Sequence, residues 1–262
     1  MEFFGFPGGV DGTMVGSKKS WRVYIGTSGF YYDSWYGKFY PDDLSKRKLL
    51  EYYSGVFNTV ELNSTFYHLP KESTVMGWCE KVGRGFLFSV KVSKYITHRL
   101  KLKGAHEPLE LFFSRVRGFG RKLGVVLFQL PPSLKRDDDL LASFLSQLPS
   151  VYRYAIEFRH ESWFDEGVYQ LLKEADVAFC AQSHPRLPET LVVTSRIIYV
   201  RFHGVPKLYT SSYSDGALRR WAKELKEASG GKREIFCYFN NDVEGHAVEN
   251  AMTLRKYLTG TL

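Results

Sequence analysis

Cysteine is scarce in this sequence, and no long apolar run is present. The three cysteines, Cys79, Cys180 and Cys237, lie far apart and form no CxxC pair. Neither a disulfide framework nor a cysteine zinc site is indicated, so we expect a reducing compartment, the cytoplasm. Since no stretch reaches the roughly 18 apolar residues that a membrane helix needs, we expect no membrane partner.

The first 20 residues lack a positively charged start followed by a hydrophobic core, so no signal peptide is predicted. We expect a flexible N-terminal arm at residues 1–20 and one domain over residues 21–262. No internal repeat, low-complexity linker or shift in composition divides the rest of the chain.

Length and charge narrow the class of protein. A chain of 262 residues suits one α/β barrel, which typically has about 250 residues. The 36 basic and 28 acidic residues give a net charge of +8. This charge favours a small anionic or phosphate-containing ligand or a nucleic acid, although a moderately basic enzyme is the plainer alternative. The oligomeric state stays open.

Eight short runs rich in β-branched and aromatic residues recur along the chain. Each has the length of a strand and is almost continuously apolar, which is typical of strands covered on both faces. The runs are Val23–Ser28, Thr59–Asn63, Phe86–Val92, Gly124–Leu130, Tyr154–Arg159, Val177–Gln182, Ile197–His203 and Ile235–Asn240.

Segments with helical spacing lie between the runs. Acidic residues at Asp137 and Asp215 precede apolar stripes, and another stripe covers His246–Leu258. Alternation of strand and helix from end to end predicts a parallel sheet, and eight units predict a closed (β/α)8 TIM barrel. A doubly wound sheet is the alternative, but Gly26–Gly29 lacks the GxGxxG spacing.

One face of six strands becomes polar toward its C-terminal end, when side chains are assigned alternately to the two faces. If that face points inward, its polar groups meet in one pocket at the end of the barrel where active sites lie. Buried charges there need partners or a ligand, so a structural salt-bridge layer is the alternative. The residues are Glu61, Asn63, Lys91, Gln129, Glu157, Arg159, Arg201, His203, Tyr238 and Asn240.

Six motifs occur in order between about Val23 and Leu258. Together they resemble the YecE-like family, known as domain of unknown function 72. The resemblance implies an α/β barrel and brings no established reaction; Phe30 stands where members often have Trp. The motifs are Gly26-Thr-Ser-Gly-Phe30, Glu61-Leu-Asn-Ser-Thr-Phe-Tyr67, Phe128-Gln-Leu-Pro-Pro132, Glu157-Phe-Arg-His160 with Trp163, Arg201-Phe-His-Gly204, and Tyr238-Phe-Asn-Asn-Asp242 with Gly245 and Ala247.

Three side chains are candidates for catalysis. Glu157 is the candidate general acid or base, because burial and nearby cations can shift the pKa of a carboxylate. His203 could protonate a leaving group. Lys91 could hold a phosphate or carboxylate, or form a Schiff base. The plainer alternatives are that Glu157 only pairs with Arg159 and that His203 is a satisfied core histidine.

Further polar residues are candidates for binding the ligand. Arginine forks suit anions, neutral amides supply hydrogen bonds, and Ser28 with Gly29 would let a ligand approach the backbone. The loop at Asn240–Asp242 precedes the last helix, where such barrels often bind phosphate, although the loop could simply cap turns. The expected binding residues are Ser28, Glu61, Asn63, Gln129, Arg159, Arg201, Tyr238, Asn240 and Asn241.

Aromatic and basic residues crowd the loops expected at the barrel mouth. Rings there could stack on bases or sugars, and the cations could contact a phosphate backbone. Loop packing and a solvated charged surface are the alternatives. The aromatic residues are Phe30, Tyr31, Trp35, Tyr36, Phe66, Tyr67 and Trp163, and the basic ones Lys94, His98, Arg99, Lys101 and Lys103.

No cofactor is firmly indicated. An oxygen-rich set could bind Mg²⁺ or Mn²⁺, but there is no HExxH motif and the many ligands of a multinuclear zinc barrel are missing. We therefore expect no metal site and keep divalent-metal dependence as the less favoured alternative. The set is Glu61, Glu157, His203 and Asp242.

Three hypotheses about function remain. The first is a hydrolase or lyase that uses acid–base chemistry on a phosphorylated or nucleic-acid-like substrate. The second is a non-catalytic protein that binds nucleic acid or a nucleotide. The third is an enzyme specific for sugars or carboxylates, since aromatic faces and amides suit those ligands equally well.

Overall fold

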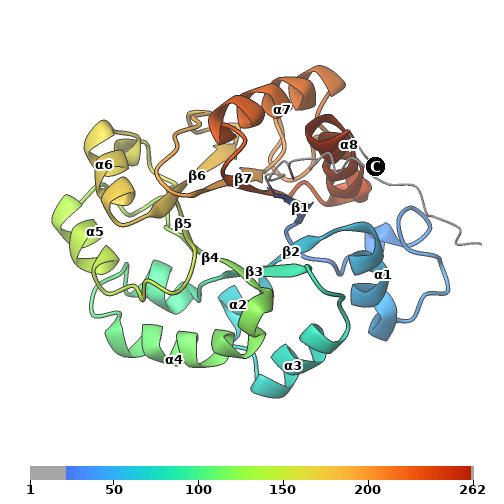
Figure 1. Cartoon of the computed structure of the whole chain (residues 1–262), viewed down its shortest axis with the longest axis horizontal. Helices are drawn as coiled ribbons and strands as arrows, with labels where there is room; N and C mark the ends of the chain where they lie inside the picture. Colours follow the sequence, from blue (N-terminus) through green and yellow to red (C-terminus); the bar gives the residue numbers. More distant parts are fainter. Residues whose placement is uncertain (1–21, 261–262) are drawn as a thin grey trace, which may run out of the picture.

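Eight parallel strands form a nearly closed barrel in the computed structural model, which describes residues 22–260 (Figure 1). The arm expected at residues 1–20 lies outside the described part of the chain. Neighbouring strands follow the order β1-β8-β7-β6-β5-β4-β3-β2, which confirms the predicted TIM-barrel class. The strands are β1 (Val23–Thr27), β2 (Thr59–Leu62), β3 (Leu87–Lys91), β4 (Leu123–Gln129), β5 (Tyr154–Glu157), β6 (Val177–Ser183), β7 (Ile197–Phe202) and β8 (Glu234–Phe239).

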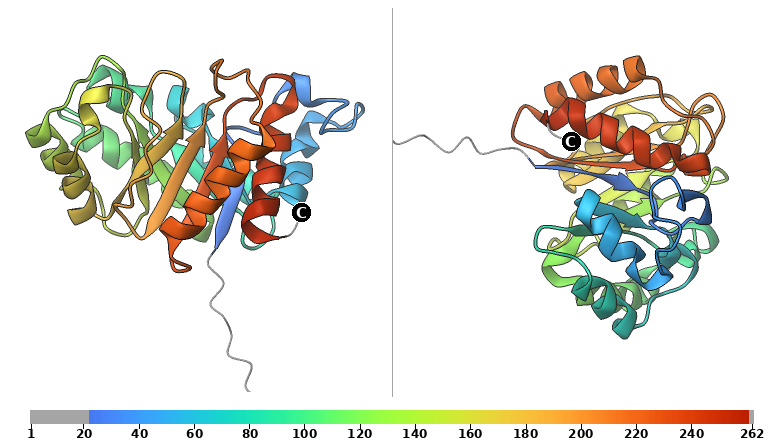
Figure 2. Two further views of the ribbon diagram at one scale, coloured as in Figure 1. Left: turned by 90° about the horizontal axis from the view of Figure 1, so that it is seen from above. Right: turned by 90° about the vertical axis from the view of Figure 1, so that its right-hand side faces the viewer.

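Helices surround the strands on the outside of the barrel (Figures 1 and 2). The helix predicted after Asp137 forms because its carboxylate accepts a hydrogen bond from the Leu140 amide at 2.9 Å. The helices are α1 (Leu49–Val56), α2 (Ser64–Tyr67), α3 (Glu72–Glu80), α4 (His106–Val116), α5 (Asp138–Leu145), α6 (Glu166–Glu174), α7 (Asp215–Ser229) and α8 (His246–Thr259).

The predicted alternation of strand and helix fails at one crossover. No helix joins β6 to β7, where residues 184–196 run as an irregular segment. Pro185 and Pro188 explain this, because proline lacks an amide hydrogen and disfavours helical geometry in the residue before it. This segment therefore stays available to build the rim of the barrel mouth.

The barrel closes between β1 and β2 through one backbone bridge and the Tyr53 side chain rather than through a regular ladder. An isolated bridge joins Ser28 to Glu61, and the Tyr53 hydroxyl donates to the Thr59 carbonyl and accepts from the Thr27 amide. A Cβ atom at Gly26 would lie 2.1 Å from the Thr59 carbonyl oxygen, so only glycine permits this approach.

Apolar side chains fill the lower part of the barrel, as the alternation of faces predicted. The inner cluster includes Leu87, Val125, Leu127, Tyr199 and Phe236, all buried. A larger apolar cluster lies between the strands and the helices. The polar residues at the ends of the strands therefore lie above a closed apolar floor.

Among residues 22–260, no helix is long and apolar enough to span a membrane. All three cysteines are free thiols.

Candidate active site at the barrel mouth

Two glutamates and one arginine form the centre of a buried network above the apolar floor. Arg201 donates to Glu61 Oε1 and to Glu157 Oε2, each at 2.7 Å. Glu61 also accepts hydrogen bonds from the hydroxyls of Ser28 and Tyr199 at 2.7 Å. Since both carboxylates are fully buried, these contacts replace the water that the charges lose.

His203 extends this network from the end of β7. Its Nε2 lies 2.7 Å from Glu157 Oε1, and its Nδ1 lies 3.2 Å from the amide nitrogen of Asn240. Arg159 Nη2 also lies 3.1 Å from Nε2, and 2.9 Å from Glu157 Oε1. Because the carboxylate can only accept, the shorter contact assigns the proton to Nε2, which donates to Glu157 while Nδ1 accepts from Asn240. Burial and the neighbouring Arg159 lower the pKa of His203 from 6.5 to about 3, so the ring is neutral.

Glu157 is a paired charge rather than a poised base. Burial opposes its ionisation, yet the charges of Arg159 and Arg201 outweigh burial and hold the pKa of Glu157 well below its usual range. Arg159 Nη2 lies 2.9 Å from Glu157 Oε1. The geometry thus agrees with the alternative reading in which Glu157 pairs with cations. We call Glu61, Glu157, Arg201 and His203 the buried charge layer.

A cavity of about 320 Å³ opens above the buried charge layer. Among residues 22–260, three cations reach its wall against one carboxylate, that of Asp242. The Nε atoms of Arg159 and Arg201 are buried and find no hydrogen-bond acceptor among the described residues. The wall is formed by Asn63, Tyr67, Lys91, Gln129, Arg159, Arg201, Tyr209, Asn240 and Asp242.

Lys91 ends β3 and reaches this wall with only 9% of its surface exposed. Its Nζ lies 4.0 Å above the centre of the Phe66 ring and forms no ion pair with a carboxylate of the described chain. Burial and the positive charge of Arg201 lower the pKa of Lys91 from 10.5 to about 8. Lys91 therefore changes charge close to physiological pH.

Asp242 follows β8 and contributes an acidic group to the same wall. Burial raises its pKa from 3.8 to about 6, and its Oδ1 accepts no hydrogen bond from the described residues. The indole of Trp35 donates to the Asp242 carbonyl at 3.2 Å and so fixes this loop. The sequence predicted Asp242 as part of a possible phosphate-binding loop and as a possible metal ligand, but not as an acid or base, because the face alternation of β8 ends at Asn240.

The predicted site residues separate into two groups. The cavity wall contains Lys91, Asn63, Gln129, Arg159, Arg201 and Asn240. The others lie behind the wall, fully buried and hydrogen-bonded to protein groups. Tyr238, for example, shares its hydroxyl with Thr59 and Ser89, each at 2.7 Å. This second group is Ser28, Glu61, Glu157, His203, Tyr238 and Asn241.

Asn241, predicted as a binding residue, is not among the residues that line the cavity. Its amide donates to the Ser211 carbonyl and to Asn250 Oδ1, both at 2.9 Å. The reason is the alternation of faces: Asn240 points to the barrel axis, so the next side chain points toward α8. Asn241 thereby ties the loop after β7 to α8.

The aromatic residues of the mouth also divide into some that are buried behind the cavity wall and some that line the cavity. Trp163 and Trp35 are fully buried, and Trp163 stacks on Phe158 with ring centres 4.7 Å apart. They pack loops and are not free to stack on a ligand. Tyr67 and Tyr209 are exposed and line the cavity. Tyr209 was not predicted, because it belongs to an irregular loop without a periodic pattern.

The oxygen-rich set considered for a divalent metal does not assemble. Glu61 and Glu157 each face Arg201, and His203 donates to Glu157. Within residues 22–260, no group of three His, Cys, Asp or Glu side chains has the arrangement of a metal site.

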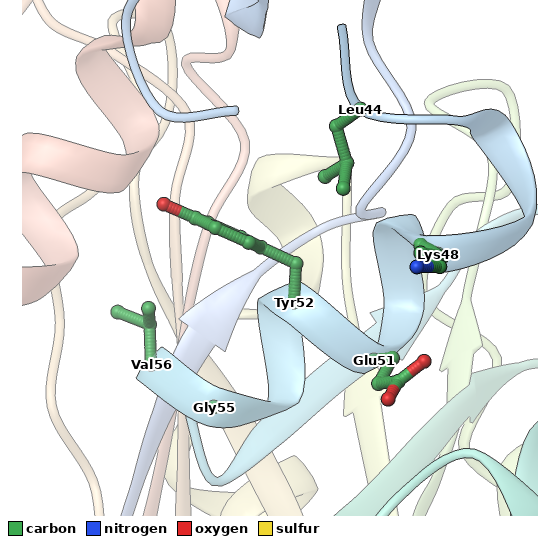
Figure 3. A pocket seen from close by; sticks show the side chains of 6 residues that line it. All are labelled: Leu44, Lys48, Glu51, Tyr52, Gly55 and Val56. Atoms are coloured by element: carbon green, nitrogen blue, oxygen red, sulfur yellow. The ribbon is translucent and has the colours of Figure 1, made fainter. Parts of the chain in front are cut away.

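A larger hollow of about 510 Å³ lies outside the barrel, along α1 (Figure 3). Its only ionisable side chains besides Tyr52 are Lys48 and Glu51, which are exposed and form no buried network. We therefore take the charged cavity at the barrel mouth, rather than this larger hollow, as the candidate site.

The model of a family described as "Protein of unknown function DUF72" matches residues 24–261. This chain belongs to the DUF72 family. The UPF0759 protein YunF of Bacillus subtilis is 26% identical over 90% of this chain and 94% of its own. The crystal structure of a DUF72 family protein from Thermotoga maritima is 31% identical, with a TM-score of 0.84 over 90% of this chain and 99% of its own.

A DUF72 family protein from Enterococcus faecalis has a TM-score of 0.77 at 20% identity, over 90% of this chain and 95% of its own, and shows the shared fold alone. The predicted YecE-like resemblance is thus confirmed. The matches establish the family and the fold.

Proposed function

We propose that the cavity at the barrel mouth is the active site of a hydrolase or lyase that acts on a small anionic, phosphate-bearing substrate. One observation carries the proposal: Lys91, Arg159 and Arg201 line one cavity in which Asp242 is the single carboxylate. Glu61 and Glu157 already bond both Nη atoms of Arg201, so the donors that face an anion are Lys91 Nζ and the unpartnered Nε atoms of Arg159 and Arg201. Charged donors of this kind bind phosphate oxygens. Glu61 and Glu157 of the buried charge layer hold Arg201 in place from behind.

Lys91 and Asp242 are the acid–base pair in this proposal. In a hydrolase, Asp242 accepts a proton from the attacking water, while Lys91 gives a proton to the leaving oxygen. In a lyase, Asp242 removes a carbon-bound proton and Lys91 protonates the leaving group. Arg159 and Arg201 hold the phosphate oxygens in both cases. Glu157 and His203 then act as positioning residues, which replaces the catalytic roles first considered for them.

The first test is binding of orthophosphate, measured by calorimetry and by the thermal unfolding midpoint at pH 7. The wild type should bind and be stabilised, because a ligand that prefers the folded state raises the midpoint. Lys91→Met should weaken binding about tenfold or more, whereas the exposed Lys173→Met serves as the control and should bind like the wild type. Equal binding by the wild type and Lys91→Met would contradict the proposal.

The second test is the pH dependence of turnover on a panel of phosphate monoesters. The profile of kcat/KM should be bell-shaped, with limbs near the pKa of Asp242, about 6, and of Lys91, about 8. Asp242→Asn should lower kcat about 100-fold and remove the acidic limb. An unchanged profile in that variant would exclude Asp242 as the base.

Nucleic-acid or nucleotide binding without catalysis is the second candidate, and the basic loop after β3 favours it. Lys94 is exposed and lies 5.6 Å from the centre of the Tyr67 ring on the cavity rim, with the exposed Arg99 following it. Binding to single-stranded DNA should then fall steeply with salt, and Lys94→Gln with Arg99→Gln should reduce that slope. Absent or salt-insensitive binding would remove this candidate.

A further inference from the structure

A second lobe adjoins the cavity on the side of β4, β6 and β7. It has a volume of about 360 Å³. Gln129, Arg159 and Tyr209 line both hollows, so the two lobes share one wall. The remaining lining residues of the second lobe are Pro132, His184, Arg186, Leu187 and Leu208.

The two lobes differ in chemistry. Among the described residues, Lys91, Arg159 and Arg201 line the first lobe. The second lobe shares Arg159, adds the exposed Arg186, and has apolar side chains from Pro132, Leu187 and Leu208. Burial and the charge of Arg159 lower the pKa of His184 from 6.5 to about 4, so its ring is neutral at pH 7. The second lobe thus suits an uncharged group with apolar surface.

The crossover without a helix forms much of this lobe. His184, Arg186 and Leu187 come from the segment that joins β6 to β7. Tyr209 comes from the loop after β7, where its backbone adopts a positive φ of 65° and its amide donates to the His203 carbonyl at 2.6 Å. A non-glycine residue held in this conformation needs support from its surroundings, which fixes Tyr209 between the lobes.

We propose that the second lobe binds the organic group of the substrate, a ring-sized apolar group attached to the phosphate held in the first lobe. The substrate class is then a phosphate monoester of an aromatic or similarly flat alcohol, with its phosphate beside Arg159. This inference rests on the proposed function, since it places the organic group relative to a phosphate in the first lobe.

The experiment compares the affinities of orthophosphate and phenyl phosphate at pH 7 by calorimetry. The wild type should bind phenyl phosphate about tenfold more tightly, because the ring loses contact with water in the second lobe. Leu187 lines the second lobe and is not among the lining residues of the first. Leu187→Trp should therefore fill the second lobe, bring the ratio of affinities close to one and leave orthophosphate binding unchanged. Leu208→Ala should lower the ratio by removing apolar contact.

Val151→Trp is the matched control, because Val151 is 76% exposed and lies in the loop before β5, among neither set of lining residues. It should keep the wild-type ratio. Equal affinity of the wild type for both probes, or an unchanged ratio in Leu187→Trp, would overturn this inference and leave the proposed function standing. Failure of both probes to bind the wild type would overturn both.

Discussion

Two sets of charges lie close together at the barrel mouth and behave differently. In the buried charge layer, Glu61 and Glu157 meet Arg201 at 2.7 Å, and the pKa of Glu157 is held far below its usual range. On the cavity wall, Lys91 and Asp242 lack such partners, and their pKa values move toward neutrality. Paired charges keep their ionisation state and fix geometry, whereas unpaired charges next to a cavity are available to a ligand.

The largest change in stability is expected when the buried charge layer is disrupted. Glu157→Gln removes the partner of Arg159, Arg201 and His203, so it should lower the free energy of unfolding by about 3–5 kcal/mol. Urea denaturation at pH 7 measures this. Glu161→Gln, at an exposed position nearby, should change stability by less than about 0.5 kcal/mol. A Glu157→Gln protein as stable as the wild type would contradict the distinction between paired buried charges and unpaired charges on the cavity wall.

Removal of the Lys91 charge should raise the free energy of unfolding, whereas Glu157→Gln should lower it. The folded protein releases the Lys91 proton at about pH 8, whereas the unfolded chain keeps it to about pH 10.5. The wild type therefore gains stability as pH rises from 8 to 10.5. Lys91→Met should be more stable than the wild type by about 3 kcal/mol at pH 7, and the difference should shrink across that range. A destabilised variant would show that Lys91 is a paired charge.

Asp242 should behave as the acidic counterpart with a smaller effect. Its folded-state pKa of about 6 exceeds 3.8, so the stability of the wild type is highest below pH 3.8, falls as pH rises from 3.8 through 6, and stays lower above that. Asp242→Asn should be about 2 kcal/mol more stable than the wild type at pH 7, with some screening by solvent. The two proteins should be equally stable below pH 4. A difference in the free energy of unfolding below pH 4 would show that the substitution alters packing rather than only removing a charge.

The smallest expected change concerns His203, whose ring should not titrate near neutral pH. The His203 ring should stay neutral from pH 5 to pH 8, because its pKa is about 3. Nuclear magnetic resonance of the ring nitrogens should show the Nε2-protonated form throughout this range. A midpoint near 6.5 would place His203 among the groups available for proton transfer.

The sequence predicted the strands to within about two residues at either end, because strands covered on both faces are almost continuously apolar. Period-two alternation also predicted which side chains face the barrel axis. It could not predict whether an inward-facing side chain lines the cavity or is buried behind its wall. Arg201 reaches the cavity wall, while His203, two residues later, lies behind it. Side-chain length and pairing across strands decide this, and neither appears in the spacing along one strand.

Loops limited the prediction of the site more than strands did. Asp242 and Tyr209 belong to irregular segments, where no period assigns a direction to a side chain. The missing helix between β6 and β7 had a usable signal in Pro185 and Pro188, which interrupt any helical stripe in that segment. Proline spacing would therefore have located the segment that builds the second lobe.

The most direct test of the central claim is a crystal structure of the protein soaked with tungstate, a heavy analogue of phosphate. Anomalous scattering should place the anion in the first lobe, within hydrogen-bonding distance of Lys91 Nζ and the guanidinium of Arg159. Tungstate bound only at other surfaces, with the first lobe free of anomalous signal, would contradict the account.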